Sequence, residues 1–92
     1  MKVNVMYLGR AKKETGVSNE AYYLDRVHTV QEFIAHRICV RHQRLAEYIL
    51  DGSGAILDIV AIFVGDTKVE SNCGVLLKDA DEMIIMPPIA GG

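Results

Sequence analysis

The last six residues of the sequence, Pro87-Pro88-Ile89-Ala90-Gly91-Gly92, could do chemistry through a terminal carboxylate. Two prolines favour an extended exit from the preceding element, and six extended residues reach roughly 20 Å. The two glycines have no side chains, so such an end can enter a narrow channel and leaves its carboxyl carbon unhindered. A terminal carboxylate, with an ordinary pKa of about 3.5, is ionised at neutral pH and is a poor electrophile. It would need ATP-dependent conversion to an acyl adenylate, carried out by another protein.

The other reactive side chains do not form a recognisable site. His36 and His42 would lie on different faces of one helix, and no ligand set completes a metal site with either of them or with His28. Cys39 and Cys73 are too few for an iron–sulfur cluster or a four-cysteine zinc site, and we interpret them as small buried residues in a reducing compartment. The serines lie in predicted turns without a nucleophile motif, and no glycine loop fits a phosphate. We therefore predict no metal and no catalytic residue in the isolated chain.

The composition suits one small domain. The chain has 92 residues, of which 50% are hydrophobic and 24% charged, enough for one modest core. Its formal charge of −2 lacks the basic excess expected of a nucleic-acid-binding protein. No run approaches the length of a membrane span, and the N-terminus does not resemble a signal peptide. We expect a cytoplasmic protein with no nucleic-acid or membrane partner.

The N-terminal half predicts two strands and a helical region. Alternation around Val3, Val5 and Tyr7 predicts a strand over residues 2–8, followed by a short helix over 10–15 that Gly16 closes. Residues 20–25 predict a second strand that returns beside the first. Thr29 and Glu32 form a capping box that opens a helical region over 29–50. The pattern is compatible with one helix or with two helices separated near residues 41–43.

The C-terminal half predicts three more strands. Residues 57–64 are the most hydrophobic run and predict a buried central strand, and residues 67–70 and 82–86 predict two others after turns. This order predicts an α+β fold, a β-grasp roll. It would have a mixed sheet of four to five strands, one principal helix on one face, and the first and last strands adjacent in the middle. We expect a β-grasp domain over 1–86 and a flexible tail over 87–92.

A docking surface follows from the alternation in the first strand. If Val3, Val5 and Tyr7 face the helix, then Met6 and Leu8 lie on the opposite face of the sheet. Ile84 and Met86 of the neighbouring last strand would join them in an apolar patch that suits a partner protein. The alternative is that a loop covers this face.

Three segments carry a resemblance to a known family. The C-terminal segment Asp79-Ala80-Asp81-Glu82-Met83-Ile84-Ile85-Met86-Pro87-Pro88-Ile89-Ala90-Gly91-Gly92 resembles the signature of the MoaD/ThiS sulfur-carrier family. The small subunits of molybdopterin synthase in that family end in D-G-D-E, an apolar strand and P-P-V-x-G-G. The segment after the first strand, Gly9-Arg10-Ala11-Lys12-Lys13-Glu14-Thr15-Gly16, resembles the family's start, and Thr29-Val30-Gln31-Glu32-Phe33-Ile34 resembles its T-V-x-x-L-L helix opening. The resemblance spans nearly the whole chain.

The resemblance implies a ubiquitin-like fold and a sulfur carrier that is inert alone but serves as the small subunit of a sulfurtransferase. An E1-like enzyme would use ATP to adenylate Gly92, and a desulfurase system would supply the sulfur of a thiocarboxylate. A MoaE-like large subunit of molybdopterin synthase would then receive this sulfur for molybdenum cofactor synthesis. No cofactor would be bound permanently. Gly91 would allow threading, and Pro87, Pro88, Ile89 and Ala90 would line the path, while Leu8 and Met86 fall where such carriers contact the activating enzyme.

The sequence also departs from the family pattern. Ala80 stands where relatives have a turn glycine, so this turn either avoids positive φ or is strained. Phe63-Val64-Gly65 stands where many relatives have Val-Asn-Gly, and residues 71–75 resemble an added loop. Other functions compatible with the tail are tRNA thiolation, thiazole synthesis and conjugation to protein lysines. A binding module with an incidental tail is a further alternative.

Overall fold

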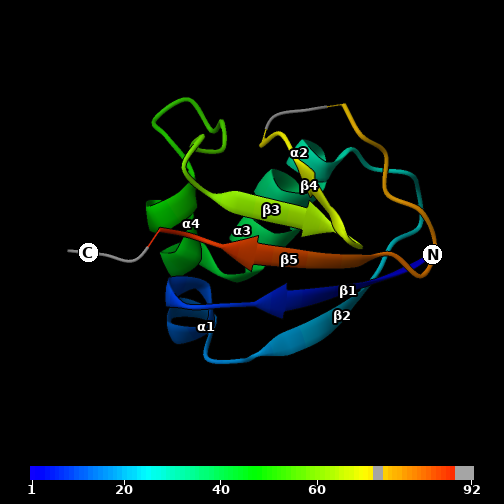
Figure 1. Ribbon diagram of the computed structural model, residues 1–92, viewed down its shortest axis with the longest axis horizontal. Coiled ribbons are helices and arrows are strands. Elements are labelled where there is room, and N and C mark those ends of the chain that lie inside the picture. The colour runs from blue at the N-terminus through cyan, green and yellow to red at the C-terminus, as the bar shows by residue number, and fades with distance from the viewer. Residues whose placement is uncertain (72–73, 89–92) are drawn as a thin grey trace.

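The computed structural model describes residues 1–71 and 74–88 and contains a five-stranded mixed sheet. Its strands are β1 (Lys2–Tyr7), β2 (Asn19–Tyr23), β3 (Ala61–Val64), β4 (Thr67–Val69) and β5 (Glu82–Met86). They lie in the order β2-β1-β5-β3-β4, in which β1 and β5 are parallel and the other pairs are antiparallel. The first and last strands are therefore adjacent and β5 occupies the centre (Figure 1). The predicted α+β, β-grasp architecture is confirmed.

The helices pack on one face of this sheet. Helix α1 (Arg10–Thr15) is short and ends at Gly16 as predicted, and Gly16 has a left-handed conformation. The second helical region consists of α2 (Val30–Phe33), a π-helical segment η1 (Ile34–Ile38) and α3 (Cys39–Arg41). Then His42, at φ −119° and ψ 76°, separates α3 from α4 (Gln43–Ile49). Of the two alternatives for residues 29–50, the broken helix is correct.

The capping box forms at the start of α2. The Glu32 backbone N–H donates to Thr29 Oγ1 at 3.1 Å, and the Thr29 backbone N–H donates to Glu32 Oε1 at 2.9 Å. Two of the amides that lack partners at a helix start are thereby paired.

A single core lies between the sheet and the helices. The inward residues of β1 are Val3, Val5 and Tyr7, and all three are fully buried. The other buried contributors from strands and helices are Ala11, Tyr22, Val30, Phe33, Ile34, Ile38, Cys39, Leu45, Ile49, Ile62, Met83 and Ile85.

The strand predicted over residues 57–64 is wrong in two respects. It begins only at Ala61, and its place in the sheet is between β5 and β4 rather than at the centre. Ile56 and Val60 are buried while Ile59 is 66% exposed, so this stretch is a loop anchored in the core at two points. A continuous apolar run does not distinguish an anchored loop from a strand buried on both faces. The first two strands also have other ends than predicted. β1 spans Lys2–Tyr7 instead of residues 2–8, and β2 spans Asn19–Tyr23 instead of residues 20–25.

The turn before β5 is strained at Ala80. Ala80 has φ 71° and is the one residue other than glycine with positive φ in the described ranges. Its N–H donates to the Lys2 carbonyl at 2.8 Å, and the Lys2 N–H donates to Asp79 Oδ1 at 2.8 Å. These bonds tie the turn to the start of β1, so the backbone holds a conformation that favours glycine.

Candidate functional site

The face of the sheet opposite the helices carries a row of apolar side chains. Cα pairing places Met6 of β1 beside Ile84 of β5, and Ile84 beside Phe63 of β3. Since side chains alternate along a strand and Val5, Tyr7 and Ile85 are buried in the core, these three lie on the opposite face. The predicted orientation of Met6 and Ile84 is confirmed.

Two more apolar residues extend this row toward the end of β5. The Leu8 N–H donates to the Ile85 carbonyl at 3.1 Å, which continues the β1–β5 pairing past the end of β1. Met6, Leu8 and Met86 are 44%, 36% and 41% exposed, so no loop of the described chain buries them. We call Met6, Leu8, Phe63, Ile84 and Met86 the open-face patch.

Phe63 is the member of this patch that the sequence prediction missed. Residues 57–64 were interpreted as a strand buried on both faces, whereas Ile62 is fully buried and Phe63 is partly exposed. Alternation starting from Ile62 is the signal that would have placed Phe63 outside.

Polarity changes along this face. Asn4 and Glu82, which are partners in the β1–β5 register, line a hollow of about 400 Å³ together with Asn19 and Asp66, and Met6 and Ile84 of the open-face patch form part of its wall. Leu8 and Met86 continue the apolar surface from there toward the end of β5. A partner that buries apolar surface would therefore sit where β5 ends.

The chain leaves the sheet beside this patch. β5 runs toward the end of the molecule where α1 and α4 lie (Figure 1). Pro87 is buried and Pro88 is exposed, so the first residue of the predicted tail packs against the body. Ile89, Ala90, Gly91 and Gly92 lie outside the described residues.

A partly buried polar cluster, which the sequence prediction also missed, lies on the helix side of β1 and β2. Glu20 Oε1 accepts hydrogen bonds from the hydroxyls of Tyr7 at 2.5 Å and Tyr22 at 2.6 Å, and lies 2.6 Å from His42 Nε2. The Tyr7 and Tyr22 hydroxyls are 3.0 Å apart. These contacts join the β1–β2 pair to the residue that breaks the helix, which explains how an irregular His42 is held in one conformation.

Electrostatics in this cluster follow from burial and from Glu20. Burial raises the pKa of Glu20, but hydrogen bonds from Tyr22, Tyr7 and His42 outweigh it and leave this pKa below its usual range. Burial and the bond to Glu20 raise the pKa values of Tyr7 and Tyr22, so both phenols stay protonated donors. The cluster therefore stabilises the ionised carboxylate of Glu20.

The remaining candidate residues are separate from one another. His28 is buried with its Nδ1 3.0 Å from the Arg26 carbonyl oxygen, and His36 is exposed on η1. Cys39 is buried, and burial raises the pKa of its thiol to about 12, as expected of a small core residue. Cys73 lies outside the described residues. Within residues 1–71 and 74–88, no three His, Cys, Asp or Glu side chains gather in a way that could hold a metal ion.

Sequence comparison finds no matching protein-family model and no matching curated protein. Structure comparison does find similar folds. SAMP1 from Haloferax volcanii has a TM-score of 0.87 at 16% identity over all of both chains. A Pyrococcus furiosus protein described as molybdopterin converting factor subunit 1 has a TM-score of 0.76 at 27% identity, covering 97% of this chain and 99% of its own. Subunit 1 in the complex of subunits 1 and 2 of the molybdopterin-converting factor from Helicobacter pylori has a TM-score of 0.59 at 26% identity over all of both chains.

The chain has the ubiquitin-like β-grasp fold of these MoaD/ThiS-type proteins.

Within this ubiquitin-like fold, contacts of Arg10 hold α1 against α4 next to the end of β5. Arg10 forms an ion pair with Glu14 at 2.8 Å, and its Nη2 donates to the Tyr48 hydroxyl. The Arg10 guanidinium also lies 4.3 Å from the Tyr48 ring centroid. Because α1 begins two residues after Leu8, these contacts also fix the end of the open-face patch. None of the helices described is long and apolar enough to cross a membrane.

Proposed function

We propose that this chain is a carrier whose terminal glycine, Gly92, is activated by a partner and then bears sulfur. One observation carries the proposal: the central strand β5 ends beside the open-face patch, so residues 88–92 begin where a partner protein would dock. The similarity to MoaD/ThiS-type proteins supports it. An activating enzyme that covers Met6, Leu8, Ile84 and Met86 would have the tail beside it.

The proposed chemistry has two stages, both at the carboxylate of Gly92. First, a carboxylate oxygen attacks the α-phosphorus of ATP in an E1-like enzyme, which forms an acyl adenylate and releases pyrophosphate. Then the outer sulfur of a persulfide from a desulfurase system attacks the carboxyl carbon and displaces AMP, which forms an acyl disulfide. A thiol attacks the donor's sulfur of this disulfide, so that the S–S bond breaks, the donor forms a new disulfide with the thiol, and Gly92 keeps the thiocarboxylate. Gly91 has no side chain to obstruct either partner, and Pro87, Pro88, Ile89 and Ala90 would connect it to the sheet. Because the partner would use ATP, the proposal also assigns the chain to the cytoplasm.

We further propose molybdopterin synthesis as the destination of the sulfur. The P. furiosus and H. pylori proteins support this branch, and the latter is in complex with subunit 2 of the same factor. By analogy, a MoaE-like large subunit would receive the tail of this chain.

Co-expression with an E1-like enzyme and a desulfurase tests the carrier role. The intact mass of the purified chain is expected to show replacement of one oxygen by sulfur, located at Gly92 by peptide mapping. Deletion of Gly92 is expected to abolish the product. A chain that never gains sulfur under these conditions, while a known carrier does so in parallel, would contradict the proposal.

A second candidate function is attachment to other proteins. The similarity to SAMP1, which is described as a small archaeal modifier protein, favours it. In that case the activated Gly92 would acylate a lysine amine, with release of AMP. Gly92-linked lysine adducts on other cellular proteins, recovered by peptide mapping, would support the modifier role, whereas a thiocarboxylate without adducts would support sulfur transfer.

A further inference from the structure

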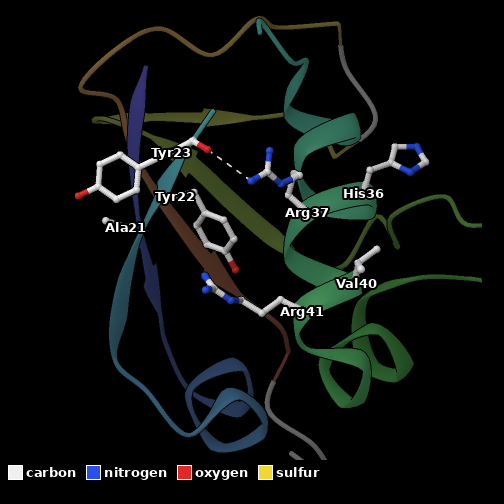
Figure 2. A pocket seen from close by; sticks show the side chains of 7 residues that line it. All are labelled: Ala21, Tyr22, Tyr23, His36, Arg37, Val40 and Arg41. Atoms are coloured by element: carbon white, nitrogen blue, oxygen red, sulfur yellow. Dashed lines mark hydrogen bonds between the residues drawn. The ribbon is translucent and has the colours of Figure 1, made fainter. Parts of the chain in front are cut away.

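A hollow lies between the free edge of the sheet at β2 and the neighbouring helical segments η1 and α3. The proposed carrier role does not use this hollow. Its volume is about 390 Å³, and it is lined by Ala21–Tyr23 from the strand and by His36, Arg37, Val40 and Arg41 from the helix (Figure 2). It shares no residue with the open-face patch. A partner could therefore occupy the hollow while another protein covers the patch.

The backbone of β2 is available on this side. Met1 and Leu24 exchange two hydrogen bonds, of 2.8 Å and 3.2 Å, and the Tyr7 N–H donates to the Ser18 carbonyl at 2.8 Å. In an antiparallel pair only alternate residues bond to the neighbouring strand, so Ala21 and Tyr23 direct their N–H and C=O groups outward. Among the residues that the structure describes, one side chain bonds to these outward groups: Arg37 Nη2 donates a hydrogen bond to the Tyr23 carbonyl. At 3.4 Å this bond is long and easily displaced.

The hollow is cationic, although the whole chain has a formal charge of −2. Arg37 and Arg41 point from the helix toward β2, with the Tyr22 ring between their guanidinium groups in the view of Figure 2. Arg41 lies 5.2 Å from the Tyr22 ring centroid, and its side chain is 56% exposed. Its carboxylate neighbour is Glu20, at 3.6 Å, whose other oxygen already accepts hydrogen bonds from Tyr7 and Tyr22. Within the described part of the chain, none of the residues that line the hollow is acidic.

We propose that this hollow binds an extended acidic peptide of a partner protein, which adds to β2 as a further strand. The free edge accounts for an extended backbone, because Ala21 and Tyr23 present donors and acceptors at strand spacing. The two arginines account for acidic side chains, since guanidinium groups form strong hydrogen bonds with carboxylates. This proposal does not depend on the chemistry of Gly92, because it uses only β2 and the helix.

A titration followed by NMR tests the proposal on the full chain. The probe is the peptide Val-Glu-Val-Glu-Val-Glu-Val, whose alternation gives one acidic and one apolar face as a strand. We expect saturable shift changes that are largest at the backbone amides of Ala21 and Tyr23, and weaker binding at higher salt. Arg37→Glu and Arg41→Glu are each expected to weaken binding roughly tenfold or more, because each replaces an attraction by a repulsion. Lys13→Glu, the same charge reversal on exposed α1, is expected to change it by less than about twofold.

Three results would overturn the proposal. The first is the absence of shift changes at millimolar peptide, and the second is equal binding of a peptide in which lysine replaces glutamate. The third is a response confined to the arginine side chains without the Ala21 and Tyr23 amides, which would indicate a simple anion site. The comparison of the two peptides uses the unaltered protein, so misfolding of a variant cannot mimic it.

Discussion

Replacing Ala80 by glycine is expected to stabilise the protein. A side chain in the left-handed region costs roughly 1–2 kcal/mol, and Ala80 has φ 71°. Glycine removes this cost but loses about 0.5–1 kcal/mol more conformational entropy on folding. Ala80 is exposed, so little packing is lost with its methyl group. The net gain in the free energy of unfolding should be about 0.5–1 kcal/mol, which corresponds to roughly 2–8 °C in Tm for a domain of this size.

Urea unfolding followed by far-UV circular dichroism measures this gain. The midpoint should rise at unchanged m, since the folded state and the area exposed on unfolding stay the same. Ala35→Gly is the matched control, because Ala35 lies in the π-helical segment η1, where the same substitution should cost about 1 kcal/mol. The sign of the effect thus depends on backbone conformation alone. A less stable Ala80→Gly variant would refute the reasoning that the turn is strained.

Three further predictions concern the buried cluster, the open-face patch and the core cysteine. Glu20→Gln should lower the free energy of unfolding by about 1–3 kcal/mol at neutral pH. Because the folded pKa of Glu20 is lowered, the wild type loses this advantage as pH falls through the glutamate range, and an equal deficit in strong acid would contradict the assignment. Met6→Glu should cut adenylation by an E1-like partner roughly tenfold, read as pyrophosphate release. Val27→Glu, which alters an apolar residue 51% exposed in a loop away from the patch, should not, and equal losses would argue against docking there. Cys39, with its thiol pKa raised to about 12, should resist iodoacetamide in the folded protein and react after unfolding, whereas fast labelling of native Cys39 on peptide mapping would disprove its burial.

Local patterns predicted most of the scaffold because they depend on neighbouring residues. The capping box at Thr29 and the alternation in β1 each fix a conformation within a few residues. The five strands and the central pairing of β1 with β5 followed from their order and from the small number of ways to pack one helical layer on a short sheet.

Features that depend on long-range contacts could not be predicted in this way. The local pattern allowed a break near residues 41–43 but could not decide between one helix and two, because the irregular His42 is held by Glu20 from another element. The place of Phe63 on the open face was missed as well. In an unbroken run of apolar residues, the sequence does not show which residues anchor a loop in the core and which alternate along a strand. The free β2 edge beside Arg37 and Arg41 likewise exists only once the strand order is known.

The burial of Pro87 sets a limit on distance for every partner of the tail. Since Pro87 is packed against the body, only residues 88–92 can extend from it, and at about 3.4 Å per residue they span at most roughly 17 Å. Any enzyme that acts on Gly92 must therefore bring its reacting atoms within that radius of the end of β5. Two partners with unrelated chemistry would both have to hold their reacting atoms within this distance of the end of β5. An insertion or deletion after Pro87 would therefore misplace Gly92 for both of them.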